Sequence, residues 1–183
     1  MLATALIFLV RTAADFFTGA LLLRFLLQWA RASQRNPLSD FVIALTNFAV
    51  RPARRVIPGW GGLDLSTLVL AWLTQFAAFF IMVQLGGDAL RLIGGASIAA
   101  LMLIALVNVV RILLYIIMIV VIVQAVMSWV NPYSPIAPML NALTRPFLRP
   151  FQRLIPPVAN VDLSPLFVIV ACQLLLILLA NVA

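Results

Sequence analysis

Few residues in this sequence are suited to acid–base or nucleophilic chemistry. Its 183 residues include no histidine, the 12 basic residues are all arginines and the 5 acidic residues are all aspartates. This composition removes the imidazole bases, His-ligated metals and lysine Schiff bases on which many enzymes depend. Cys172 is the single cysteine, so we expect a small buried residue without a disulfide partner. We therefore expect no enzyme, no catalytic residue, no metal site and no cofactor.

The polar residues with a definite spacing form a motif that occurs twice. It reads R-P-x-x-R-x-I-P, then five residues and D-L-S, at 51–66 and again 98 residues later at 149–164. An apolar run precedes each copy and another follows it. The motif residues that we single out are Arg51, Pro52, Arg55, Pro58, Asp64, Ser66, Arg149, Pro150, Arg153, Pro156, Asp162 and Ser164.

Two interpretations of this motif stay open. In the first, the prolines end one helix and orient the next, and the arginines bind phosphates at the membrane surface. In the second, Arg55 pairs with Asp64 and Arg153 pairs with Asp162, so that each pair fastens the polar segment to the apolar run after it. The middle arginine, Arg54, is a glutamine in the second copy. We therefore expect Arg54→Ala to be less damaging than Asp64→Ala.

The overall composition places the chain in a membrane. It is 65% hydrophobic and 9% charged, with a mean hydropathy of +1.18, and a soluble domain cannot bury that much apolar surface. The isoelectric point near 11.5 would suit nucleic acid, but the arginines lie beside apolar runs. We expect anionic lipid headgroups as partners, and no direct binding of nucleic acid. No basic region precedes the first apolar run, which predicts a retained span rather than a cleaved signal.

Apolar runs and polar connections alternate along the chain. The predicted spans are 2–30, 64–85, 96–130 and 162–183. The polar connections within the two repeats are 31–63 and 131–161, and the repeats themselves are 1–87 and 88–183. At an offset of 98 residues, 14 of the 39 positions between 37 and 75 carry identical residues, which indicates an internal duplication.

Each polar connection has the features of an amphipathic helix. Asn36 and Pro37 supply a cap and a first helical residue, and Ser134 and Pro135 repeat that pattern. We expect the first of these helices to end at Pro52, after about 13 residues, which is too short to span a bilayer. It either lies on the membrane surface or enters the membrane partway.

The run 92–130 is long enough for either one helix or two spans. Neither glycine nor proline occurs between 96 and 130, which favours one helix. Four spans then place both arginine-rich connections on one side, and the positive-inside rule makes that side cytoplasmic. The predicted fold is an all-α membrane protein with about four transmembrane helices in two parallel repeats.

Four charged residues fall within predicted spans, away from their first and last residues. Arg11 and Asp15 are four residues apart and can partly neutralise each other on one helical face. Arg24 either extends towards the interface or meets a carboxylate inside the protein. Arg111 lies 100 residues after Arg11 and extends the duplication to the first span of each repeat.

The motifs resemble those of the YggT family of small multi-pass membrane proteins. The resemblance rests on N-P-L-S-D-F-V at 36–42, R-P-A-R-R-V-I-P at 51–58, D-L-S at 64–66 and the second copies of the last two, so it covers most of the chain. It implies two tandem repeats in an inner-membrane protein without established enzymatic activity. Bacterial members are linked to osmotic tolerance, potassium balance and cell-division gene clusters, and chloroplast relatives to cytochrome maturation or nucleoid organisation.

Two functions from different classes remain after an enzyme is set aside. We expect a scaffold or an assembly and homeostasis factor, because the arginine-rich and proline-rich connections suit docking of lipids or other membrane proteins. The alternative is a cation-conducting or osmoregulatory protein, since span–short helix–span repeats can enclose a pore. Glycine pairs at 86–87 and 94–95 permit close approach of helices and so allow a homo-oligomer.

Overall fold

The computed structural model describes residues 1–32, 37–57, 59, 64–85, 98–131, 133–154 and 162–180. Within these residues the regular secondary structure consists of six helices and no strand, which confirms the all-α prediction. The helices are α1 (Leu2–Trp29), α2 (Pro37–Val56), α3 (Leu65–Leu85), α5 (Ile98–Val130), α6 (Ala137–Leu154) and α7 (Ser164–Ala180).

Three of these helices are long and apolar enough to cross a bilayer. They are α1, α3 and α5, with 28, 21 and 33 residues. The apolar helix α7 is shorter, with 17 residues, and is the fourth span of the predicted set. Helix α5 is continuous through residues 108–111, so the run 92–130 does not divide into two spans with a turn there. The predicted boundary between the repeats, at residues 87 and 88, lies outside the described residues.

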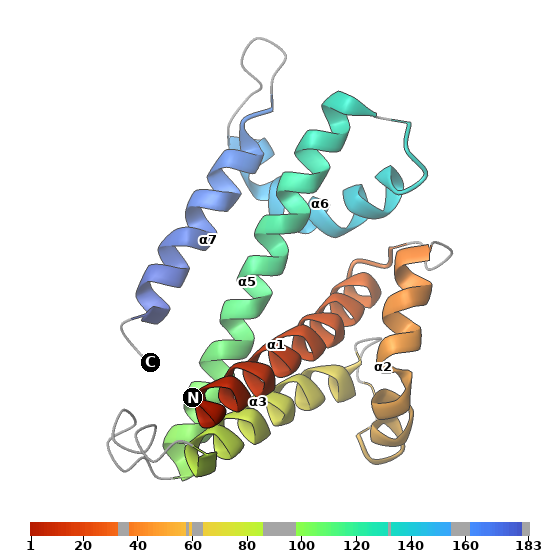
Figure 1. The fold of residues 1–183 in the computed structure, drawn as a ribbon. Helices are drawn as coiled ribbons and strands as arrows, with labels where there is room; N and C mark the ends of the chain where they lie inside the picture. Colours follow the sequence, from red (N-terminus) through yellow and green to blue (C-terminus); the bar gives the residue numbers. More distant parts are fainter. Residues whose placement is uncertain are drawn as a thin grey trace.

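The helices form two parallel repeats (Figure 1). Helices α1 and α3 pack antiparallel, α5 lies against both, and α7 returns along α5. Helix α2 packs on α1 and α3, and α6 packs on α5 and α7. Leu26 and Leu27, in the last turns of α1, share an apolar cluster with Met139, Leu140 and Leu143 of α6. Because α2 also contacts the last part of α1, both amphipathic helices lie at the same end of the bundle.

Helix α1 ends in a Schellman motif. The amide of Arg31 donates to the carbonyl of Gln28 at 3.1 Å, and the amide of Ala32 donates to the carbonyl of Leu27 at 3.0 Å. Arg31 has a φ of 49°, a left-handed conformation that costs a non-glycine residue about 1 kcal/mol. This motif closes the last turn of α1 and satisfies backbone carbonyls that would otherwise lack partners.

The prediction that α2 ends at Pro52 is wrong. The helix continues to Val56 and has 20 residues, and α6 likewise passes through Pro146 and Pro150. A proline inside a helix removes one backbone hydrogen bond and can bend the helix without ending it. Val50, two residues before Pro52, is buried against Leu21 and Leu22 of α1 and Ala71 of α3, which holds this part of α2 against the spans.

The start of α6 also differs from the prediction. Ser134 and Pro135 form a turn, closed by a hydrogen bond of 2.9 Å from the amide of Ala137 to the carbonyl of Ser134. The helix itself begins at Ala137, whereas α2 begins at Pro37, as the sequence predicts. The cap-and-proline pattern therefore starts a helix in the first repeat and a turn before the helix in the second.

The parallel arrangement predicts the labelling of single cysteines in membranes. With Cys172 replaced by alanine, Arg51→Cys and Arg145→Cys should react with an impermeant thiol reagent from the same side, since α2 and α6 share one end. Both side chains are exposed, so the labelling reports sidedness rather than burial. Labelling of the two positions from opposite sides would contradict parallel repeats.

Candidate functional site

The aspartate of the first motif fastens α2 to α3. Asp64 directly precedes α3 and is only 3% exposed. Its Oδ2 accepts a hydrogen bond of 2.8 Å from Arg54 Nε and a second from Arg54 Nη2, while its Oδ1 accepts one from Ser66 Oγ. The backbone carbonyl of Asp64 accepts from the amide and the hydroxyl of Thr67 at 3.1 and 2.7 Å. One residue thus closes the first turn of α3 and holds the last turn of α2.

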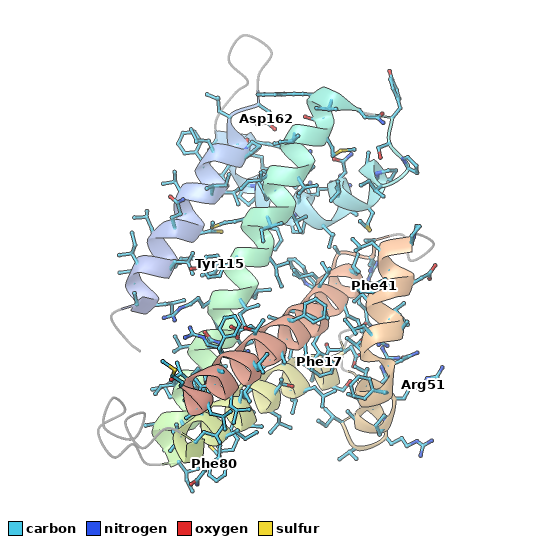
Figure 2. The ribbon with its side chains drawn as sticks, in the orientation of Figure 1. Phe17, Phe41, Arg51, Phe80, Tyr115 and Asp162 are labelled. Atoms are coloured by element: carbon cyan, nitrogen blue, oxygen red, sulfur yellow. The ribbon has the colours of Figure 1, made fainter. Side chains whose placement is uncertain are left out.

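The second motif repeats this geometry with a neutral donor. Asp162 lies just before α7 (Figure 2). Its Oδ2 accepts from Gln152 Nε2 at 2.8 Å, and its Oδ1 accepts from the backbone amide of Ser164 at 2.9 Å. We call these two arrangements the clasps: Arg54–Asp64–Ser66 and Gln152–Asp162–Ser164.

The predicted partners of the two aspartates are wrong. Asp64 pairs with Arg54 and not with Arg55, and Asp162 bonds to Gln152 and not to Arg153. In each repeat the donor stands ten residues before the aspartate. Successive helical residues are about 100° apart around the axis, so when α2 continues past Pro52 the side chain of residue 54 faces α3. Glutamine at the equivalent position also donates to its aspartate, so the second repeat keeps a donor at this position.

The clasps shift the acidity of both aspartates. Burial raises the pKa of the Asp64 carboxyl. Hydrogen bonds from Arg54 and Ser66, together with the nearby arginine charges, lower this pKa by more than burial raises it. The net pKa of Asp64 lies below its ordinary value. The pKa of Asp162 is also lowered, because its hydrogen bonds outweigh its smaller desolvation. Both carboxylates are therefore charged acceptors at neutral pH.

Arg24 joins α1 to α2 in a way that the sequence does not predict. Its side chain is buried, with 8% of the residue exposed. Arg24 Nη1 donates to Thr46 Oγ1 at 2.8 Å, and its two terminal nitrogens lie 3.4 and 3.3 Å from Asn47 Oδ1. The arginine turns into the protein interior, but it forms no ion pair with a carboxylate among the described residues. A hydroxyl and an amide of α2 satisfy it instead.

A polar cluster in the middle of the bundle joins three spans. Gln75 Nε2 of α3 donates to Asp15 Oδ1 and to Thr18 Oγ1 of α1, both at 3.0 Å. Asn108 Nδ2 of α5 donates to Gln75 Oε1 at 2.9 Å and to Asp15 Oδ1 at 3.3 Å. Polar side chains that bond to one another across helices hold spans together in an apolar solvent. Asp15 also lies 3.9 Å from Arg11 Nε, as measured from its Oδ2.

The remaining motif residues lie at the surface or outside the described chain. Arg51 and Pro52 are exposed on α2, as are Arg149 and Pro150 on α6; Arg51 is at the edge of the molecule in Figure 2. Arg111 is half-buried on α5. Pro58 and Pro156 lie outside the described residues. Several contact residues are absent from the predicted set, namely Thr18, Thr46, Asn47, Arg54, Gln75, Asn108 and Gln152.

One sequence signal pointed to part of this missing set. Thr46 and Gln75 both align with identical residues 98 positions later, at Thr144 and Gln173. Polar residues repeated within apolar or amphipathic helices mark positions where helices meet. Asn108 carries no such signal, and only the packing of α5 against α3 shows its role.

Two parallel repeats of span, amphipathic helix and span, each closed by an aspartate clasp, define a duplicated helical membrane protein. The chain belongs to the CCB3/YggT family, which matches residues 3–85 and again 103–183.

Relatives from several bacteria support this assignment. An uncharacterised protein of Pseudomonas aeruginosa is 36% identical over 185 residues, covering 98% of this chain and 90% of the relative. The YggT protein of Escherichia coli is 31% identical over 164 residues, with 90% and 83% covered. A protein of Vibrio alginolyticus is 29% identical over 168 residues, with 91% and 88% covered. No solved structure matches the chain.

The first clasp predicts a difference between neighbouring arginines. Arg54→Ala leaves the buried Asp64 carboxylate without its charged donor. We expect a cost of about 1–3 kcal/mol of unfolding free energy, below that of breaking a fully buried pair, because Arg54 itself is half-exposed. Arg55→Ala should change stability by less than about 0.5 kcal/mol. Unfolding of both variants in detergent micelles measures this difference.

A third variant separates the hydrogen bond from the charge. Arg54→Gln places the donor of the second clasp in the first, so its stability should fall between wild type and Arg54→Ala. Equal stability of Arg54→Ala and Arg55→Ala would contradict the assigned partner of Asp64.

The lowered pKa of Asp64 predicts an acid-dependent loss of stability. An unperturbed aspartate has a pKa of about 3.9. Because the folded-state pKa lies below this value, the charged carboxylate stabilises the folded protein above about pH 4, and this contribution is lost as the pH falls through the folded-state pKa. Asp64→Asn should lower Tm at pH 7 and reduce the further fall in Tm below pH 4. A fall as steep as that of wild type would rule out this contribution.

Proposed function

We propose that this membrane protein is a non-enzymatic scaffold, or an assembly and homeostasis factor, of the bacterial inner membrane. The observation that carries the proposal is the placement of α2 and α6 at one end of the bundle, each fastened by a clasp to the span that follows it. Helices fixed in this way present a defined surface at the membrane interface, as docking of a partner requires.

The charge of that surface supports a cytoplasmic orientation. Exposed arginines lie on both amphipathic helices, and Asp40 is the one acidic residue within them. Positive charge beside spans favours the cytoplasmic side, where anionic lipids also gather. The exposed arginines of α2 and α6 are Arg51, Arg54, Arg55, Arg145, Arg149 and Arg153.

The use of the polar side chains supports a structural role. Asp64 and Asp162 accept hydrogen bonds that hold helix ends, and Ser66 donates to Asp64. Gln75 and Asn108 bond to each other between spans. Groups committed to such contacts serve assembly of the helices rather than proton transfer or nucleophilic attack.

A cation-conducting or osmoregulatory role, including potassium homeostasis, is the second candidate. Asp15 favours it, because a carboxylate in the middle of a span marks ion pathways in many membrane proteins. The amides of Gln75 and Asn108 around Asp15 offer further oxygen ligands. Their mutual hydrogen bonds instead support a role in holding α1, α3 and α5 together.

Crosslinking in native membranes tests the scaffold role. A photoreactive residue at position 55 or 153, exposed and outside the clasps, should give discrete adducts with another membrane protein or a second copy of this chain. The same residue at Leu174, on the apolar outer face of α7, is the matched control. Adducts from position 55 on α2 should weaken when Arg54→Ala releases the first clasp.

Ion flux in proteoliposomes tests the second candidate with the same preparation. Scaffold function predicts no cation flux above that of empty vesicles, for wild type and for Asp15→Asn alike. A potassium or sodium flux that Asp15→Asn abolishes, together with no adducts from positions 55 and 153, would overturn the scaffold proposal.

A further inference from the structure

A polar cavity lies between α1 and α2 in the first repeat. Its volume is about 420 Å³, within the range of about 300–1,000 Å³ typical of ligand pockets. The hydrophobic part of its wall comes from both helices. Its polar lining consists of Arg24, Gln28, Ser39, Asn47, Arg51 and Arg54.

The lining of this cavity carries an excess of positive charge. Arg24, Arg51 and Arg54 contribute three guanidinium groups. Within the part of the chain that the structure describes, the one carboxylate bonded to them is Asp64, which pairs with Arg54. Arg24 is buried, and its partners Thr46 and Asn47 are neutral. The charge of Asp64 acts on Arg24 as well, but this carboxylate is already bonded to Arg54. A desolvated charge that shares its counter-charge in this way is costly, so an anion in this cavity would offset that cost.

The duplication supplies a second cavity at the equivalent place. It lies between α5 and α6 and is lined by Gln124, Met127, Ser128, Ala137, Leu140 and Asn141. These positions match residues 24, 27 and 28 at an offset of 100, and residues 39, 42 and 43 at an offset of 98. The same groove is thus present in both repeats.

The two cavities differ in charge and in size. The second has a volume of about 100 Å³, and no arginine lines it among the described residues. Gln124 stands where the first repeat has Arg24, and it donates to Asn141 Oδ1 at 3.1 Å. Gln152 stands where the first repeat has Arg54. The second repeat therefore forms this groove with neutral residues, so the fold does not require the arginines of the first repeat.

We propose that the α1–α2 cavity binds a phosphate group, and that the α5–α6 cavity has lost or never acquired this capacity. Guanidinium groups bind phosphate through paired hydrogen bonds in a fixed planar geometry. Arg24 lies five residues before Trp29, a residue type typical of the membrane interface, so the cavity is level with lipid headgroups. The headgroup of an anionic phospholipid is one source of the phosphate, and a soluble phosphate compound is the other. This inference does not depend on the scaffold role.

Matched substitutions in the two repeats test the proposal. Arg51→Gln removes a cavity arginine without touching the clasp. Arg149→Gln makes the same change of charge at the aligned position of α6, outside the second cavity. Binding is followed by the rise in Tm of delipidated protein in micelles titrated with phosphatidylglycerol, with phosphatidylcholine as the neutral-headgroup comparison. Inorganic phosphate, against chloride at equal ionic strength, tests the soluble source.

We expect phosphatidylglycerol to stabilise wild type and Arg149→Gln alike, and to bind Arg51→Gln about tenfold more weakly. Arg24→Gln, which installs the residue of the second repeat, should show the same loss. Stabilisation by inorganic phosphate that Arg51→Gln weakens would also support the site, with a soluble phosphate as its ligand. Equal weakening by Arg51→Gln and Arg149→Gln would show general surface electrostatics and overturn the proposal, as would no stabilisation by either probe.

Discussion

The burial of the Asp64 carboxylate is the constraint on which the first repeat depends. A charge that is 3% exposed beside an apolar solvent must be surrounded by donors, and Arg54 and Ser66 supply them. This requirement fixes the last turn of α2 against the first turn of α3. A fixed α2 in turn brings Thr46 to Arg24 of α1. One desolvated carboxylate thus sets the position of the amphipathic helix relative to both spans of its repeat.

The second repeat preserves this geometry with a different set of charges. Gln152 replaces Arg54 as the donor to the aspartate, and Gln124 replaces Arg24 beneath the amphipathic helix. The more exposed Asp162 needs less compensation than Asp64, so a neutral amide suffices. Duplication has therefore kept the hydrogen-bond positions and allowed the charge to vary, which separates what the fold requires from what the first repeat adds.

The composition and the internal repeat predict most of the helices and their order. Helix formation depends on residues close in sequence, namely the spacing of apolar residues and the positions of turn residues. The continuity of α5 followed from the lack of glycine and proline between 96 and 130. The clasp donors could not be predicted in the same way. If α2 ended at Pro52, the position of Arg54 relative to Asp64 could not be inferred from helical geometry. The tertiary structure shows that the helix continues to Val56 and that Arg54 faces Asp64. Which spans meet at Gln75 is likewise a property of tertiary structure, since helical period gives a face but no partner.

The length of α5 has a consequence for the bilayer itself. Its 33 residues extend about 50 Å at about 1.5 Å per residue, against a hydrocarbon thickness of about 30 Å. This hydrophobic mismatch is relieved by tilting of the helix or by thickening of the surrounding lipid. Because α5 packs on α1, α3, α6 and α7, any change in its tilt is transmitted to both repeats. Lipid chain length and lateral tension both change the bilayer thickness, so they act on both repeats of this protein through the tilt of α5.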